Sequence, residues 1–166
     1  MAEIGTVIEG KYEIIKLIGK GAMSQVYLAM DNNLNKQWAI KEIVKEARNR
    51  NNEIIVQSAI AEANMMKKLD HPCLPRIVDI INRDNVIYVV MDYIEGEPLS
   101  KVLQEDGAQP QEVVLEWAES LCGVLEYLHR QNPPIIYRDM KPANVMLQPN
   151  GNVKLIDFGI AREYKE

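Results

Sequence analysis

Two short stretches decide how this sequence is interpreted: Tyr137-Arg138-Asp139-Met140-Lys141-Pro142-Ala143-Asn144 and, further along the chain, Asp157-Phe158-Gly159. They combine acids, an amide and a lysine, the residue types that phosphoryl transfer requires. Asp139 can accept the proton of an attacking hydroxyl group. Asn144 and Asp157 offer the oxygen ligands that Mg²⁺ prefers. The pattern therefore predicts a site for a magnesium-bound phosphate.

The segment between the two motifs predicts a β-hairpin. Residues 145–148 and 152–156 flank Pro149-Asn150-Gly151, which is a strong turn signal. A hairpin here would let Asn144 and Asp157 point into one cleft. The structural alternative is an Asp-Asn turn followed by an unrelated Asp-Phe-Gly turn.

A glycine-bearing turn occurs near the N-terminus, in Gly19-Lys20-Gly21-Ala22-Met23-Ser24-Gln25-Val26. Glycines let the backbone approach a phosphate closely, and N–H groups in such a turn bind anions. Alone this signal is weak. Its flanks are strand-like on both sides, whereas a dinucleotide-binding fingerprint would open a helix. Ser24 stands where a third small glycine would be expected, which also disfavours the dinucleotide interpretation.

Two lysines could contact the phosphates. Alternation along a strand places Ala39 and Lys41 on one face, so an adenine ring could rest on Ala39 and Val26 while Lys41 reaches the phosphates. Lys141 could offset the negative charge that develops on a transferred phosphoryl group. The structural alternative for a lone strand lysine such as Lys41 is a solvated edge residue.

The following helix offers Glu62 as a partner that orients Lys41, on the same helix face as Ala59 and Met66. Glu42 and Glu46 are competing acids. Alternation points Glu42 to the opposite face of the strand.

The remaining pattern predicts an α+β fold in which a sheet-rich lobe precedes a helix-rich lobe. We expect an N-lobe over residues 1–92, a hinge over 93–97 and a partial C-lobe over 98–166. A helix over 53–69 accompanies the N-lobe strands, and His71-Pro72 follows it. A second helix over 110–130 carries apolar residues on one face, namely Val114, Trp117, Ala118, Leu121, Leu125 and Leu128. The expected strands are 11–18, 25–30, 37–44, 76–81 and 86–92.

Composition excludes several classes. The net charge of −5 argues against broad electrostatic binding of nucleic acid or anionic membranes. Cys73 and Cys122 are expected as buried thiols in a reducing compartment. The acidic N-terminus does not resemble a signal peptide, and no apolar run is long enough to span a bilayer. We therefore expect a cytoplasmic protein.

The order of these motifs along the chain and the spacing between them resemble those of the eukaryotic-like protein kinase family, from about residue 12 to 162. The resemblance implies a bilobal kinase fold, ATP and Mg²⁺ as cofactors, and phosphoryl transfer to Ser or Thr hydroxyls of protein substrates. It implies Asp139 as catalytic base, Lys141 as the phosphate-contacting lysine and Lys41 paired with Glu62. Asn144 and Asp157 become the magnesium ligands, and Lys141 itself favours the Ser/Thr branch. Arg138 resembles the arginine of kinases that are activated by phosphorylation.

The same resemblance implies an adenine pocket. Met91 would guard its back, backbone groups of Asp92 and Ile94 would bond the adenine edge, and Gly19, Gly21 and Ser24 would cover the phosphates. Further residues follow from it. The apolar ceiling and floor would be Val26, Ala39 and Met146, and the stacked residues that link the lobes would be Met66, Tyr137 and Phe158.

Two departures from the family are Ser24 and Tyr137, which stands where histidine is more frequent. The printed chain also stops at Glu166, before the family's activation segment and peptide-binding helices. We therefore expect residues 1–166 alone to be inactive toward peptides and open to self-association or domain swapping through the helix over 110–130. A non-catalytic nucleotide-binding or scaffolding module is the alternative function.

Overall fold

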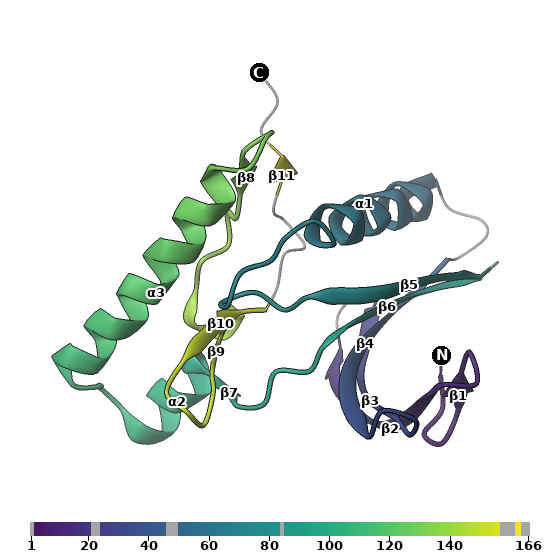
Figure 1. Cartoon of the computed structure of the whole chain (residues 1–166), viewed down its shortest axis with the longest axis horizontal. Helices are drawn as coiled ribbons and strands as arrows, with labels where there is room; N and C mark the ends of the chain where they lie inside the picture. The colour runs from purple at the N-terminus through teal and green to yellow at the C-terminus, as the bar shows by residue number, and fades with distance from the viewer. Residues whose placement is uncertain (1, 21–23, 46–49, 84, 157–161, 164–166) are drawn as a thin grey trace. The chain divides into compact units, whose positions relative to one another are not determined.

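The computed structural model describes residues 2–20, 24–45, 50–83, 85–156 and 162–163 (Figure 1). The chain forms two compact units. The first comprises residues 1–68 and 76–93, and the second comprises residues 69–75 and 94–166. Residues 69–75 therefore group with the second unit, although they connect elements of the first. Each unit is described by itself below.

The first unit is built on a six-stranded antiparallel sheet with strand order β1-β2-β3-β4-β6-β5. Strands β2, β3 and β4 curve strongly (Figure 1). The strands are β1 (Val7–Ile8), β2 (Tyr12–Lys20), β3 (Ser24–Asp31), β4 (Lys36–Val44), β5 (Ile77–Arg83) and β6 (Val86–Asp92).

The five strands expected from the sequence are all present, and β6 has the predicted bounds. Strand β1 was not predicted, because two residues are too few to show alternation. It is held by backbone bonds that flank it: the Gly5 N–H donates to the Ile14 carbonyl, and the Ile14 N–H donates to the Thr6 carbonyl. The predicted α+β class, with a strand-rich unit and a unit that contains two helices, is confirmed.

The strand register separates the two faces of this sheet. Directly opposed residues share a face, and the register opposes Val26 to Lys41 and Ala39 to Met91. Neighbouring residues along each strand lie on the reverse face, where a hydrophobic core cluster forms. That cluster consists of Ile8, Tyr12, Ile14, Tyr27, Ala29, Trp38, Ile40, Tyr88 and Val90.

Helix α1 (Arg50–Met66) belongs to the first unit. It begins and ends three residues before the predicted 53–69, but its type and place are as expected. Its buried side chains include Val56, Ala63, Met65 and Met66. Leu69, which the periodicity assigned to the helix, is buried in the second unit.

The second unit combines two helices with short strands. Its β9–β10 hairpin matches the predicted hairpin, and β7 pairs with β9 in the same sheet. Strand β8 pairs with β11. The elements are β7 (Glu97–Pro98), α2 (Leu99–Asp106), α3 (Gln111–His129), β8 (Ile135–Ile136), a 3₁₀ turn (Pro142–Asn144), β9 (Val145–Leu147), β10 (Val153–Leu155) and β11 (Arg162–Glu163).

Gly96 enters β7 with a backbone that requires glycine. Its φ is +136°, and an added Cβ would lie 2.0 Å from the carbonyl oxygen of Leu147. A side chain here would collide with β9 itself.

Helix α3 buries part of the predicted stripe. Of the predicted residues, Trp117 and Leu128 are buried and Leu121 and Leu125 are half-buried, whereas Val114 is 43% exposed and Ala118 is also exposed. Val124, which was not predicted, is buried as well, because α3 is apolar over more than one side. Self-association through its exposed apolar residues stays a prediction.

Residues 69–75 are fastened inside the second unit. The Asp70 N–H donates to the Tyr127 hydroxyl at 2.9 Å, and the Leu155 N–H donates to the Cys73 carbonyl at 2.9 Å. The expectation of two buried thiols was wrong for Cys122, which is exposed, while Cys73 is half-buried. Both thiols are free.

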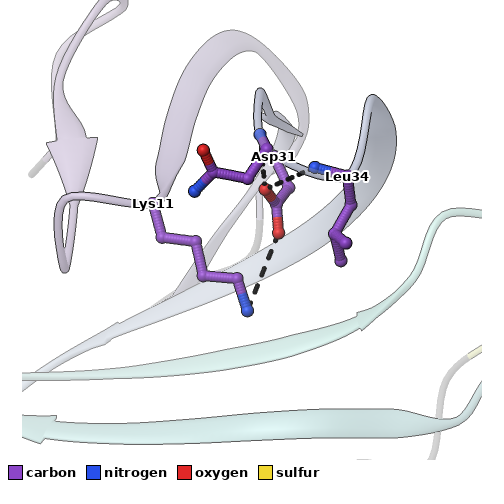
Figure 2. Close-up of polar contacts among 4 residues, drawn as sticks. Lys11, Asp31 and Leu34 are labelled. Atoms are coloured by element: carbon purple, nitrogen blue, oxygen red, sulfur yellow. Dashed lines mark hydrogen bonds and ion pairs between the residues drawn. The ribbon is translucent and has the colours of Figure 1, made fainter.

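Asp31 closes the turn between β3 and β4 (Figure 2). Its side chain is fully buried, and its Oδ1 accepts hydrogen bonds from the backbone N–H groups of Asn33 (3.0 Å) and Leu34 (3.1 Å). The Lys11 ammonium lies 3.6 Å from its Oδ2. An aspartate can form this turn because its short side chain reaches backbone donors two and three residues on.

Replacing Asp31 with alanine should lower the free energy of unfolding by roughly 1–3 kcal/mol, because two backbone donors lose their acceptor. Urea denaturation followed by circular dichroism measures this loss. Asp31→Asn is the matched control, since it retains the Oδ1 acceptor and should cost less. Equal stability of the alanine variant and the natural chain would contradict this account of the turn.

Candidate active site

Lys41 and Glu62 lie together in the first unit. Lys41 is on β4, Glu62 is on α1, and 3.6 Å separate the Lys41 Nζ from the Glu62 Oε1. Their side chains are 24% and 13% exposed, so the pair is largely withdrawn from solvent. A lysine held in this way can present a fixed positive charge to a phosphate.

The competing acids do not displace Glu62 from this role. Glu42 is 1% exposed on the reverse face of the sheet, and the Ala2 backbone N–H donates to its Oε2 at 2.7 Å. The predicted orientation of Glu42, away from Lys41, is therefore found. Glu46 lies outside the described residues.

The sheet face that carries Lys41 also carries the residues predicted to contact adenine. Val26 is opposite Lys41, and Ala39 is opposite Met91. Gly19 pairs with Val26 in the same ladder. Ile18, which precedes Gly19 and was not among the predicted residues, is 40% exposed.

Of the glycine turn, residues 19–26, the structure describes only the two ends. Gly19 is in β2, and Ser24 is the first residue of β3. Gly21, with Ala22 and Met23, lies outside the described residues.

The end of β6 presents one particular backbone group of Asp92. The Asp92 N–H donates to the Arg76 carbonyl at 3.0 Å. The carbonyl is therefore the group of Asp92 that could accept a hydrogen bond from an adenine amino group. Ile94, the other predicted hinge residue, is half-buried and belongs to the second unit.

Asp139, Lys141 and Asn144 converge in the second unit. The Lys141 Nζ lies 2.9 Å from the Asp139 Oδ2. The Asn144 amide donates to the same oxygen at 2.9 Å and to the Asp139 carbonyl at 3.0 Å. The hydrogen bond from Lys141 lowers the pKa of Asp139 below its ordinary value; partial burial opposes this, and Asn144 acts with the lysine. Asp139 is thus held as a charged carboxylate, the form that can accept a proton.

The backbone before Asp139 is strained. Arg138 has a φ of 57°, and the Asp139 N–H bonds back to the Tyr137 carbonyl at 2.7 Å. Positive φ is uncommon for a residue with a side chain, and such strain concentrates at functional sites. Tyr137 is 1% exposed, so it packs in the core of this unit.

Asn144 fits the ligand role predicted for it. Its side-chain nitrogen is committed to Asp139, which leaves its side-chain oxygen as the atom that could bind Mg²⁺. The Ile156 N–H donates to the Asn144 carbonyl at 3.1 Å, so the residue before Asp157 is tied to Asn144. Asp157 and Phe158 themselves lie outside the described residues.

The predicted site residues therefore form two groups. Lys41, Glu62 and the adenine-facing residues are in the first unit, while Asp139, Lys141, Asn144 and the half-buried Met146 are in the second. That both groups serve one nucleotide stays a prediction.

Comparison with known proteins gives the class. Residues 12–166 match the protein kinase domain. The chain is 36% identical over 159 residues to a probable serine/threonine-protein kinase of Clostridium perfringens, covering 96% of this chain and 23% of that protein. It is 35% identical over 158 residues to the serine/threonine-protein kinase PrkC of Bacillus subtilis, covering 95% and 24%. It is 32% identical over 164 residues to the serine/threonine-protein kinase PknA of Mycobacterium tuberculosis, covering 96% and 37%.

The chain belongs to the protein kinase domain family. It spans about a quarter of the length of the first two of these relatives. The helices that the structure describes are each too short or too polar to cross a bilayer.

Replacing Lys141 with methionine should raise the pKa of Asp139 toward its ordinary value, because the main hydrogen bond to the carboxylate is lost. The titration midpoint of the Asp139 carboxyl carbon, followed by NMR, should therefore move to higher pH. The natural pair stabilises the fold at neutral pH, and this stabilisation is lost as the pH falls through the lowered pKa. Lys101→Met, which removes a lysine that contacts Glu97, is the control and should leave the midpoint in place. An unchanged midpoint in Lys141→Met would contradict the assignment.

Proposed function

We propose that the protein is an ATP-dependent serine/threonine protein kinase, which transfers the γ-phosphoryl group of ATP to hydroxyl groups of protein substrates. The observation that carries the proposal is the contact of Lys141 and Asn144 with one carboxylate oxygen of Asp139. Few structural roles require a lysine, an amide and a strained backbone around one half-exposed acid. A kinase catalytic loop uses an acid that accepts the hydroxyl proton and an asparagine that holds Mg²⁺, and a neighbouring lysine can offset the charge of the transferred group.

The residues of the second unit would act on the hydroxyl group and the phosphate. Asp139 accepts the proton of the substrate hydroxyl group while the hydroxyl oxygen forms a bond to the γ-phosphorus of ATP. The bond between the γ-phosphorus and the oxygen that bridges it to the β-phosphate breaks, and ADP leaves. Lys141 lies beside Asp139 and offsets the charge that spreads over the transferred group. Asn144 and Asp157 would hold Mg²⁺, which supplies further positive charge to the phosphates when it is bound.

The residues of the first unit would hold the nucleotide. Lys41 contacts the phosphates and is oriented by Glu62. The sheet face around Val26, Ala39 and Met91 receives the adenine ring. Because the proposed phosphoryl donor is ATP, we place the phosphoryl transfer in the cytoplasm.

The preference for Ser and Thr is supported by the position of Lys141 two residues after Asp139, and by the names of the relatives. A non-catalytic nucleotide-binding module is the competing function. It would bind ATP without Asp139-dependent transfer.

The test is transfer of radiolabelled phosphate from ATP to a protein substrate by the full-length protein and by its Asp139→Asn variant. The variant should lose at least about a hundredfold in rate, the usual contribution of a general base. Asp79→Asn is the matched control, because Asp79 is an exposed acid on β5.

Equal transfer by the natural protein and by Asp139→Asn would exclude Asp139 as the base. ATP binding with no transfer by any form would favour the binding module instead.

A further inference from the structure

Glu42 is a buried acid that the proposed mechanism does not use. It lies on β4, is 1% exposed and belongs to the sheet face reverse to Lys41. The Ala2 backbone N–H donates to its Oε2 at 2.7 Å, although the two residues are 40 positions apart in the chain. A buried carboxylate is stable only with hydrogen-bond donors around it. The segment that contains Ala2 supplies one of these donors.

The neighbours of Glu42 on this face are polar and aromatic. The register opposes Glu42 to Gln25 on β3 and to Tyr88 on β6. Burial, and then the Glu42 carboxylate, raise the pKa of both Tyr27 and Tyr88, as expected for hydroxyl groups close to a negative charge. Ala2 packs against the core cluster to which both tyrosines belong. Ala2 thus contributes its N–H to the acid and its side chain to the core.

Residues 2–8, which we call the strap, are also bound to β2 by backbone hydrogen bonds. The Gly5 N–H donates to the Ile14 carbonyl at 2.8 Å, and the Ile14 N–H donates to the Thr6 carbonyl at 2.9 Å. Strand β1 lies within the strap and pairs with β2. The amide hydrogens of Gly5 and Ile14 therefore report whether the strap is docked, because both lose their acceptors when it leaves.

The strap makes few buried apolar contacts between its two ends. Ile4 is 72% exposed and Val7 is 51% exposed, whereas Ile8 is 2% exposed. A segment with few such contacts opens locally at a lower free energy than the core does. The hydrogen bond from Ala2 to a charged acid is then a large part of what holds the first residues of the strap.

Glu42 connects the strap to the candidate nucleotide site because it follows Lys41 directly in β4. When the strap is released, Glu42 loses the N–H donor of Ala2, and its carboxylate gains free energy by moving toward water. The backbone that moves with it also carries Lys41. The ammonium of Lys41 lies 3.6 Å from the Glu62 carboxylate, so a small shift of β4 changes this contact.

We propose that docking of the strap on Glu42 and binding of the ATP phosphates at Lys41 are coupled through β4, so that each favours the other. Glu42 is a positioning residue in this account, which rests on the proposed kinase function. The coupling is reciprocal: if the docked strap raises the affinity for ATP, ATP stabilises the docked strap by the same factor. A strap with a purely structural role would depend on Glu42 but would not respond to ATP.

The first experiment follows hydrogen exchange of the Gly5 and Ile14 amides by NMR, with and without Mg²⁺ and ATP. Saturating ATP should slow the exchange of both amides by about fivefold, the lower end of typical couplings between sites. In Lys41→Met, ATP should leave the exchange unchanged, and without ATP the exchange should equal that of the natural chain.

A substitution in the strap tests its contact with Glu42. Ala2→Pro removes the N–H donor, because proline has none. Without ATP it should speed exchange at Gly5 and Ile14 by about tenfold or more, the effect of a hydrogen bond to a charged group. Ala2→Ser keeps the N–H and is the matched control. Glu42→Gln keeps an acceptor oxygen without the charge, so it should speed exchange less than Ala2→Pro does.

The second experiment measures ATP affinity by calorimetry after deletion of residues 2–6, which removes the bonds to Glu42 and Ile14 together. This chain should bind ATP about fivefold more weakly, the same factor by which ATP slows exchange in the natural chain. Thermal melting shows whether the shortened chain is folded. If it is not, the affinity is measured with Ala2→Pro in 2 M urea, where the strap is released first, against Ala2→Ser.

The inference is overturned if ATP binds to the natural chain without slowing exchange at Gly5 and Ile14, or if removal of the strap leaves ATP affinity unchanged. Equal exchange in Ala2→Pro and Ala2→Ser would also overturn it. Failure of the proposed function looks different. If the natural chain binds no ATP, or if Lys41→Met binds it equally tightly, the nucleotide site is refuted and the coupling with it, while faster exchange in Ala2→Pro would still show docking on Glu42.

Discussion

The register of β4 between β3 and β6 is the constraint on which the proposed nucleotide site depends. It sets Lys41 opposite Val26 and Ala39 opposite Met91, and it sends the neighbouring Glu42 to the buried reverse face. A slip of one residue would exchange the two faces. Lys41 would then lie among the tyrosines of the core, and a buried glutamate would face the phosphates. The core residues on the reverse face, such as Ile40, oppose this slip because it would remove them from the cluster in which they pack.

In the second unit, one short loop holds the charged Asp139 together with Lys141 and Asn144. The backbone around Arg138 is bent into a conformation that few residues adopt, and the side chain of Asn144 returns to Asp139. Both bonds from Asn144 restrict Asp139 before any ligand is present. Such restriction lowers the cost of reaching the reactive geometry.

Much of this could be predicted from the sequence, because strong local signals determined it. Apolar composition between turn signals predicted the five longer strands, the turn at Pro149-Asn150-Gly151 predicted the hairpin, and alternation alone separated Lys41 from Glu42. Other features depend on tertiary contacts that no local pattern reports. The two residues of β1 become a strand only by pairing with β2. Helix α3 is apolar on more than one side, so packing alone decides that Val124 is buried and Val114 is not.

The candidate site likewise combines residues that local sequence signals predict with contacts that depend on the tertiary structure. Residue types and spacing sufficed to select Asp139, Lys141 and Asn144, since their chemistry is specific. The role of Asp92 was predicted only for its backbone, because nothing in the sequence indicates that its carboxylate would take the N–H of Arg76. Such a contact is visible only when strand register and side-chain position are both known.

A crystal structure of the protein with Mg²⁺ and a non-hydrolysable ATP analogue tests the central claim most directly. The account predicts one nucleotide whose phosphates contact the Lys41 ammonium and whose metal is bound by side-chain oxygens of Asn144 and Asp157. A nucleotide bound away from Lys41, or a metal bound without Asn144 and Asp157, would contradict it.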